Sequence, residues 1–392
     1  MKSLVFSIDE LYKCSTQSER RNLGLTEEKF KEKTQLLVDS LLNNTYVFSF
    51  KQCGKIFINS HTDKINYLFQ NLVLRKIYRN IETIYKLTQS NRDKIISQIE
   101  ILLKEKCPYW ILKLDIKSFY ESIDKQKIID DLKKGYRLNS QTLNLVENVL
   151  NNSSLSSVSG LPRGLCISSI MSEQYLKKFD LEIKRIDGVY YYARFVDDII
   201  IFCISEKARN ETENKIGLLF NDLKLRVNTK KIQKWDLNSS DSLSYLGYEF
   251  KHDGNDLLIT IALKKINKIK TRIVKSFLNF SKDQDFQLLK KRIKFLTGNM
   301  VLCEKKKLSH ILVGIHYNYK KITDLGALSE LDDFYRNILK CRVGKLGSCL
   351  KASISRRQRK ELFKYSFKFG FEKKVRHYFS SNDVTEITRC WQ

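Results

Sequence analysis

The sequence has few of the features that mark a disulfide-stapled, zinc-stapled or membrane-spanning protein. Only two prolines occur in its 392 residues, Pro108 and Pro162, which excludes a proline-rich linker protein. None of the nine cysteines forms a Cys-x-x-Cys pair, so we expect neither a zinc cluster nor a disulfide framework, and reduced thiols in a cytosol fit better. No apolar run approaches the roughly 20 residues of a membrane helix. The first residues turn polar too early for a secretory signal peptide.

Histidine is also scarce. The five histidines form no set with the spacing of metal ligands, so structural roles are expected for them. They are His61, His252, His310, His316 and His377.

Acidic residues are outnumbered by basic ones. The chain has 71 Lys and Arg against 44 Asp and Glu, a net charge of +27, and residues 261–392 alone carry 31 and 11. Each basic run by itself is most simply a solvated helix face. An excess of one sign over a third of the chain repels itself without a partner, so a nucleic-acid backbone surface is favoured there. The densest runs are KKINKIKTR (264–272), KKRIKF (290–295), EKKKL (304–308) and SRRQRK (355–360).

The apolar pattern predicts an α+β fold, and 42% apolar with 11% aromatic residues excludes a disordered chain. Residues 1 to about 50 and 91–106 are expected to be helical, the second helix capped by Ser90 or Asn91. Residues 71–87 fit either two strands or one helix. The middle of the chain predicts the order β-α-α-β-β-α-β, with helices on one face of a small antiparallel sheet.

Two adjacent aspartates, Asp197 and Asp198, lie in the turn between two expected strands. Adjacent carboxylates between buried strands repel each other unless a cation neutralises them, and hard oxygen ligands suit Mg²⁺. An Asp-Asp turn by itself is more often a conformational feature. Asp115 ends another apolar strand, where a buried acid is costly unless it is paired or bound to metal. If the strands are neighbours, three carboxylates converge and can hold two metal ions for phosphoryl transfer.

A stiff turn, GLPRGLCISS (160–169), lies between these acids in the sequence. Its two glycines, Gly160 and Gly164, flank a proline and an arginine, and small residues there allow a flat partner such as a base pair to approach the backbone. By itself such a turn is more often a plain junction between a loop and a helix. Its place between Asp115 and Asp197 gives it functional weight.

In their order, these segments resemble the palm motifs of reverse transcriptases. DIKSFY, which begins at Asp115, then GLPRGLCIS, RFVDD, VNTKK and LSYLGY match the motifs called A to E. FVDD takes the place of the usual YADD or YMDD box, and the resemblance covers residues 90–252. The chain departs from the family in Arg163, where glutamine is usual, and in Phe195, at the aromatic position of the acidic box. The arginine and proline signature of the fingers is not evident.

Among the subfamilies, the chain looks most like bacterial antiphage, defence-associated reverse transcriptases of the unknown-group and abortive-infection class. It is most similar to the first enzyme of the type that encodes two reverse transcriptases beside a non-coding RNA. The resemblance implies two Mg²⁺ ions, dNTPs, a DNA product and an RNA template, which a non-coding RNA would supply. It leaves room for a second reverse transcriptase subunit and for homo-oligomerisation. The unpaired cysteines and the lack of a long apolar run predict a cytoplasmic protein without a membrane partner.

The resemblance also implies the catalytic residues. Asp115 and Asp197 would be the main metal ligands, with Asp198 as the adjacent carboxylate and the Ile116 carbonyl assisting. Lys231 would donate a proton to the departing pyrophosphate. One exposed basic pair among many is the alternative for this lysine.

Tyr120, with Phe119 beside it, would be the ring under the sugar that excludes a ribose 2′-hydroxyl, and core packing is the alternative. Arg92 is the first candidate for the triphosphate, followed by Arg75 and Arg79, because planar guanidinium groups suit phosphate oxygens. Each arginine alone is more simply a surface residue.

Three residues of the glycine-proline turn are also candidates. Arg163 and Gly164 would line the pocket for the template and nucleotide, with Pro162 against the primer and template. Leu246 and Gly247 resemble the primer grip, and a plain β-turn is the alternative.

The expected architecture is a right-hand polymerase. It consists of an N-terminal helical extension (1–54), fingers (55–110), a palm (111–252) and a basic all-helical thumb with a C-terminal extension (253–392). The expected function is RNA-directed DNA synthesis. The alternatives are protein-primed or untemplated DNA synthesis by the same palm, an RNA-dependent RNA polymerase and a non-catalytic RNA-binding scaffold. A scaffold has no reason to keep three mutually repelling acids.

Overall fold

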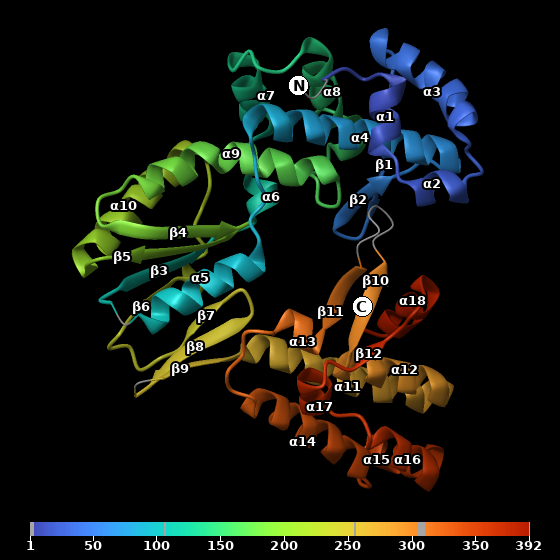
Figure 1. Cartoon of the computed structure of the whole chain (residues 1–392), viewed down its shortest axis with the longest axis vertical. Coiled ribbons are helices and arrows are strands. Elements are labelled where there is room, and N and C mark those ends of the chain that lie inside the picture. The colour runs from blue at the N-terminus through green and yellow to red at the C-terminus, as the bar shows by residue number, and fades with distance from the viewer. Residues whose placement is uncertain (1–3, 106, 255, 304–309, 392) are drawn as a thin grey trace. The chain divides into compact units, whose positions relative to one another are not determined.

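The computed structural model describes residues 4–105, 107–254, 256–303 and 310–391 (Figure 1). The basic run EKKKL (304–308) lies outside the described residues. The chain divides into two compact units, residues 1–95 with 106–237 and residues 96–105 with 238–392. The division into extension, fingers, palm and thumb stays a prediction.

The first unit begins with helices, as expected: α1 (Ile8–Cys14), α2 (Gln17–Asn22) and α3 (Glu27–Leu42). A hairpin of β1 (Phe50–Cys53) and β2 (Ile56–Asn59) precedes the long helix α4 (Lys64–Tyr85). The ambiguous residues 71–87 are therefore mainly helical. In α4 the buried apolar residues recur every three or four positions, which is the period of a helix and not of a strand.

Helix α5 (Arg92–Lys104) confirms the expected helix and one of its two proposed caps. The side-chain oxygen of Asn91 accepts a hydrogen bond from the N–H of Lys94 at 3.1 Å. This bond satisfies one of the backbone donors that a helix leaves unpaired at its N-terminus.

The central sheet of the first unit is antiparallel, with strand order β4-β5-β3-β6. On β3 the side chains of Leu112 and Leu114 belong to the main hydrophobic core, and on β5 so do Ile199 and Ile201. Because side chains alternate along a strand, Asp115 and Asp198 lie on the opposite face. The strands are β3 (Trp110–Asp115), β4 (Val189–Phe195), β5 (Asp198–Cys203) and β6 (Gln233–Asp236).

Two helices cover the apolar face of this sheet, which confirms the expected layering. Figure 1 shows α9 (Cys166–Lys184) and α10 (Glu206–Asp222) lying along the strands, and both contact β4. The shorter helices between β3 and α9 are α6 (Phe119–Ser122), α7 (Lys125–Lys134) and α8 (Ser140–Leu150).

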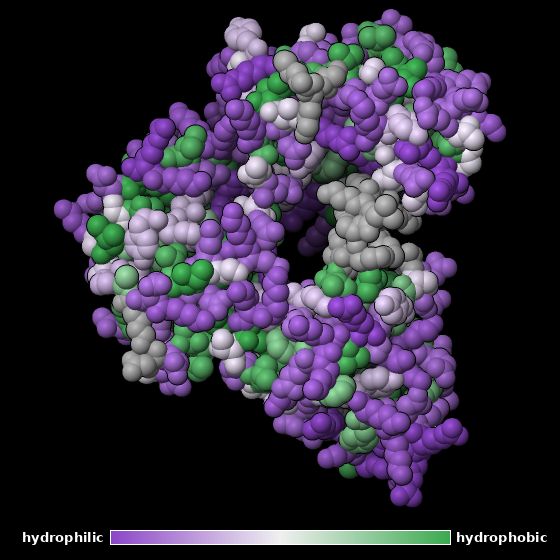
Figure 2. Space-filling model, viewed as in Figure 1, coloured by the Kyte–Doolittle hydropathy of each residue, from purple (hydrophilic) through white to green (hydrophobic). Residues whose placement is uncertain are grey.

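The second unit holds a β-meander and a mixed region of helices and strands. The meander consists of β7 (Leu243–Tyr245), β8 (Tyr248–Asp253) and β9 (Asp256–Ile261). Hydrophilic side chains predominate over α14 to α16 on the face shown in Figure 2. The helices of this region are α11 (Leu263–Asp283), α12 (Phe286–Thr297), α13 (Ile315–Asn318), α14 (Gly326–Lys340), α15 (Gly344–Ser353), α16 (Arg356–Leu362), α17 (Phe367–Glu372) and α18 (Ser381–Arg389).

The expectation that residues 253–392 are all helical is wrong. A three-stranded sheet of order β11-β10-β12 lies in this region, formed by β10 (Asn299–Cys303), β11 (His310–Gly314) and β12 (Arg376–His377). Both β10 and β11 contain three consecutive apolar residues with a β-branched member, which is typical of strands. The prediction of an all-helical region rested on the basic residues around these strands and not on this apolar pattern.

No helix among the described residues is long and apolar enough to cross a membrane.

Gly160 allows the glycine-proline turn to approach α6. The N–H of Leu161 donates to the carbonyl of Tyr120 at 2.7 Å, and a Cβ at Gly160 would clash with the backbone of Tyr120 and Glu121. We expect Gly160→Ala to lower the free energy of unfolding by about 2 kcal/mol or more, measured by thermal or urea unfolding.

Gly217→Ala is the matched control. A Cβ at Gly217 in α10 meets open space, so this substitution should raise the free energy of unfolding by up to about 1 kcal/mol. A Gly160→Ala variant as stable as the wild type would contradict the close approach.

Candidate active site

Three aspartates meet at one end of the central sheet. Asp115 on β3 is directly paired with Asp198 on β5, and the N–H of Ile116 donates to the carbonyl of Asp197 at 3.1 Å. Val196 and Asp197 form the turn that joins β4 to β5, since Phe195 pairs with Asp198. The sequence analysis predicted that the three carboxylates converge if their strands are neighbours, and β3 and β5 are neighbours.

The acids are partly buried and repel one another. The pKa of Asp198 is raised from its ordinary 3.8 to about 6, first by burial and then by the charges of Asp197 and Asp115, while Lys113 and Lys231 oppose the shift. Burial also raises the pKa of Asp197, and the charge of Asp115 acts in the same direction. Deprotonating these carboxyls therefore costs free energy, and a bound cation would offset this cost by stabilising the charged form.

Two residues of the loop after α10 hold Asp115. The ammonium of Lys231 lies 2.7 Å from Oδ1, and the amide of Asn228 donates to Oδ2 at 3.1 Å. The backbone N–H of Asn228 also donates to the Asp115 carbonyl at 2.7 Å. The predicted proton donor is thus in contact with the predicted metal ligand, and this ion pair raises the pKa of Lys231.

Asn228 was missed by the sequence analysis. It lies in VNTKK, where attention went to the basic pair. An asparagine is common in turns for conformational reasons, so its contact with Asp115, 113 positions earlier, has no local signal.

The donor chemistry of the three aspartates suits a divalent cation, although their geometry is not that of a ready-made site. Across the ranges that the structure describes, no three His, Cys, Asp or Glu side chains are arranged to hold a metal ion. One oxygen of Asp115 is instead taken by the Lys231 ammonium. Burial and mutual repulsion raise the pKa values of Asp197 and Asp198, and the Lys231 ammonium offsets part of the negative charge at Asp115. A hard metal ion bound to these oxygens would neutralise the remaining charge. Ile116, whose carbonyl was expected to assist, forms an isolated antiparallel bridge with Val227.

The turn of the acidic box is held by Arg194, another residue that the sequence analysis did not single out. Arg194 is 4% exposed and forms ion pairs with Glu173 and Asp180 on α9, both at 2.7 Å. Its Nη1 donates to the carbonyl of Val196 at 3.0 Å. Val196 has a φ of 60°, a strained value for a β-branched residue, so this bond stabilises the conformation that presents Asp197.

The predicted sugar gate is packed against the glycine-proline turn. The Arg163 guanidinium lies 5.5 Å from the centroid of the Tyr120 ring and forms a bidentate ion pair with Glu121, at 2.5 and 3.0 Å. Phe119 is 2% exposed and its ring centroid lies 5.4 Å from that of Tyr120. The structure therefore places Phe119 in the core behind Tyr120.

Strand β2 binds the same turn. The N–H of Phe57 donates to the carbonyl of Arg163 at 2.7 Å. Gly164 has a φ of 95°, and a Cβ there would press on the Phe57 carbonyl. Pro162 is buried, and its carbonyl accepts a hydrogen bond from the Ser168 hydroxyl at 2.6 Å.

Two of the three candidate arginines, Arg75 and Arg79, lie one turn apart on α4 and are bound to the N-terminal helices. Arg75 forms an ion pair with Glu19 at 2.6 Å, and Arg79 donates to the carbonyl of Lys13 at 2.9 Å. Both therefore fasten α4 to the N-terminal helices. Arg92 is the first residue of α5, and its guanidinium lies 3.9 Å from the carboxylate of Asp93.

Leu246 and Gly247 form the two-residue turn between β7 and β8, in the second unit. Both have positive φ values, 46° and 87°, as tight hairpins of this length require. The carbonyl of Gly247 accepts a hydrogen bond from the N–H of Ala262 at 3.1 Å.

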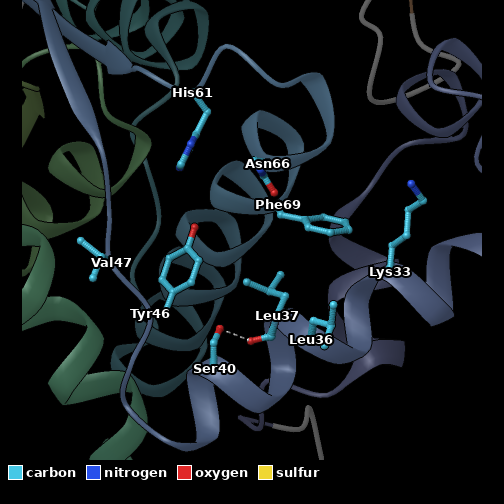
Figure 3. Close-up of a pocket in the computed structure, with 9 residues that line it drawn as sticks. All are labelled: Lys33, Leu36, Leu37, Ser40, Tyr46, Val47, His61, Asn66 and Phe69. Carbon is cyan, nitrogen blue, oxygen red and sulfur yellow. Dashed lines mark hydrogen bonds between the residues drawn. The ribbon is translucent and has the colours of Figure 1, made fainter.

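A pocket of about 260 Å³ lies elsewhere in the first unit, between α3, α4 and the segment before β1 (Figure 3). Its wall includes Tyr46, His61 and Phe69 but no carboxylate and none of the predicted site residues. Figure 3 shows Ser40 bonded to the carbonyl of Leu37 within α3, at 2.7 Å. The pocket therefore offers no acid chemistry of the kind found at the sheet.

The sequence matches the family model described as reverse transcriptase (RNA-dependent DNA polymerase) over residues 12–250, more than half of the chain. The chain belongs to this family. Membership confirms the resemblance seen in the palm motifs and the right-hand α+β fold expected from it. The three aspartates thus lie inside a reverse transcriptase domain.

Solved structures similar to this chain include telomerases from two Candida species, at low identity. Truncated apo telomerase from Candida tropicalis is 13% identical with a TM-score of 0.39, and the match covers 61% of each chain. Telomerase from Candida albicans with a fragment of telomeric RNA is 13% identical with a TM-score of 0.40, covering 87% of this chain and 70% of that one. The present chain thus spans less than two thirds of the first of these. No curated protein matches the sequence.

Asp198 makes the stability of the metal-free protein depend on pH. Its folded pKa of about 6 exceeds its ordinary value of 3.8, so the folded state binds the extra proton and loses stability as the pH rises from about 4 to 6. Two pKa units correspond to roughly 3 kcal/mol. We expect Asp198→Asn to raise the melting temperature in EDTA at pH 7 and to remove most of this pH dependence.

The control for this prediction is Asp187→Asn, which replaces an exposed carboxylate in the loop before β4. At each pH between 4 and 8, this variant should have the same melting temperature as the wild type. An Asp198→Asn variant that is less stable than the wild type in EDTA at pH 7 would refute the repulsion described here.

Proposed function

We propose that this chain is an RNA-directed DNA polymerase that adds dNTPs to a primer 3′ end by phosphoryl transfer with two Mg²⁺ ions. The observation that carries the proposal is the pairing of Asp115 with Asp198 across neighbouring strands, beside Asp197 in the connecting turn. This arrangement lies within a domain of the reverse transcriptase family.

Each residue of the site has a role in this proposal. Asp115, Asp197 and Asp198 hold the two ions, with the Ile116 carbonyl assisting. The ions, when bound, lower the pKa of the primer 3′-hydroxyl and neutralise charge on the triphosphate. Lys231 supplies a proton to the departing pyrophosphate, and its contact with Asp115 supports this role because it places an ammonium at the acids.

The nucleotide is bound between the gate and the glycine-proline turn. Tyr120 contacts the sugar and excludes a 2′-hydroxyl, and the buried Phe119 supports it. Arg163 and Gly164 line the pocket, and Arg92 remains the first proposed ligand of the triphosphate. Leu246 and Gly247 contact the primer end, with Pro162 against the primer and template.

The resemblance of the motifs to those of defence-associated reverse transcriptases also supports a proposal for the template and the biological role. The template is a non-coding RNA, and the enzyme acts in bacterial antiphage defence in the cytoplasm. The net charge of +27 supports a polyanionic partner. The same resemblance adds a second reverse transcriptase subunit and self-association to the proposal.

Incorporation of labelled dNTPs by the purified full chain tests this function. With Mg²⁺ and co-purified RNA, the wild type and Asp187→Asn should make DNA complementary to that RNA. Asp197→Asn/Asp198→Asn should lose about a thousandfold or more in rate, because the ions stabilise the transition state by several kcal/mol. RNA binding by this double variant should persist.

Other outcomes would contradict the proposal in specific ways. DNA made without RNA would indicate untemplated or protein-primed synthesis. Tight RNA binding with no incorporation by the wild type, under any primer or partner supplied, would indicate the scaffold.

The gate separates DNA from RNA synthesis. Tyr120→Ala should raise the use of ribonucleotides relative to deoxynucleotides by about tenfold or more, since the ring no longer meets the 2′-hydroxyl. Tyr136→Ala, at a tyrosine that is 93% exposed, is the control and should not change this ratio. A wild type that prefers ribonucleotides would point to an RNA polymerase.

A further inference from the structure

One edge of the sheet in the second unit presents aromatic and basic side chains to solvent. Strand β12 pairs in parallel with β10, with Arg376 opposite Asn299. Because side chains alternate in an extended chain, Arg376 and Tyr378 share one side, and both are exposed. Tyr378 is 79% exposed, so its ring is open to solvent.

The other side of this segment is firmly packed. The ring of Phe379 lies 5.8 Å from that of Phe295, which in turn lies 5.5 Å from Trp391. The indole N–H of Trp391 donates to the carbonyl of Arg272 and to the hydroxyl of Ser276, at 3.1 and 3.0 Å. Tyr378 therefore projects from a segment that Phe379 anchors on α12, and Trp391 joins this aromatic cluster to α11.

A second tyrosine is connected to the same edge. Nη2 of Arg376 donates to the hydroxyl of Tyr317 in α13 at 3.0 Å. This bond holds the guanidinium beside Tyr317 while the same strand side presents Tyr378. We call these three residues, Tyr317, Arg376 and Tyr378, the edge row.

The charges that act on the two histidines next to the edge row are positive. The pKa of His316 is lowered first by burial and then by Lys374 and Lys320, and that of His377 by burial and then by Lys294. His316 is next to Tyr317, and His377 lies between Arg376 and Tyr378. Among the described residues, every charge that shifts these two histidines is thus a lysine, so an anion would be attracted here.

We propose that the edge row is a docking surface for single-stranded RNA, whose bases stack on Tyr378 while its phosphates contact Arg376 and the neighbouring lysines. Exposed rings beside cationic side chains are the general means of binding single strands. A duplex hides the faces of its bases. Protein interfaces are rich in tyrosine and arginine but depleted of lysine, so the neighbouring lysines favour a polyanion here. This function goes beyond the proposed polymerase activity, because none of the three residues has a role in the proposed reaction.

Binding of a labelled single-stranded RNA of about 12 nucleotides to the full chain, measured by fluorescence anisotropy, tests the surface. Tyr378→Ala should weaken binding about tenfold, whereas Tyr378→Phe should bind as the wild type does, because stacking needs the ring and not the hydroxyl. Arg376→Ala should weaken binding and also reduce its salt dependence. Tyr136→Ala is the matched control, since it removes an exposed tyrosine from the first unit.

The outcomes separate this surface from the polymerase. Wild-type RNA affinity in Tyr378→Ala would overturn the proposal, whether or not the protein makes DNA. Equal weakening of binding to a fully paired RNA would overturn the preference for single strands. A change from dimer to monomer in Tyr378→Ala, with RNA affinity unchanged, would assign the row to a protein interface. Tyr378→Ala should still incorporate dNTPs on a pre-annealed primer and template. If the wild type incorporates no dNTPs on this substrate, the result counts against the proposed polymerase activity and not against the edge row.

Discussion

Mutual repulsion of three carboxylates at the end of one sheet is the constraint on which the rest of the first unit depends. The pairing of β3 with β5 places Asp115 opposite Asp198, and the tight turn adds Asp197. Burial and proximity raise the pKa of Asp198 to about 6. A protein gains nothing in stability from such a group, so the surrounding structure must hold the acids in place.

That support comes from segments far apart in the chain. Arg194 connects the acidic turn to two carboxylates of α9 and bonds the strained Val196. Lys231 and Asn228 engage both oxygens of Asp115 from the loop after α10. These contacts surround the acids with polar partners, while an apolar core lies on the opposite face of the sheet.

The second unit shows the same division between an anchored side and a functional side. Phe379, Phe295 and Trp391 pack the inner side of the β12 segment, which frees its outer side for Arg376 and Tyr378. Its excess of positive charge destabilises it in isolation and favours a polyanion. In the sequence, the basic residues are the most obvious feature of this region. The positions of its aromatic rings depend on the sheet of β10, β11 and β12, which the charge pattern does not predict.

Much of the site was predictable because its motifs are local. The apolar strands around Asp197 and Asp198, the strand that ends at Asp115 and the cap at Asn91 are each encoded within a few residues, and local period and capping chemistry suffice to find them. The sequence by itself thus determined the family, the layering of the central sheet and the three acids that meet at its end. Only the tertiary structure decided that Arg75 binds Glu19, that Arg194 holds the turn and that Asn228 binds Asp115. Such contacts join residues that are distant in the chain, and no local pattern records which pairs the fold will bring together.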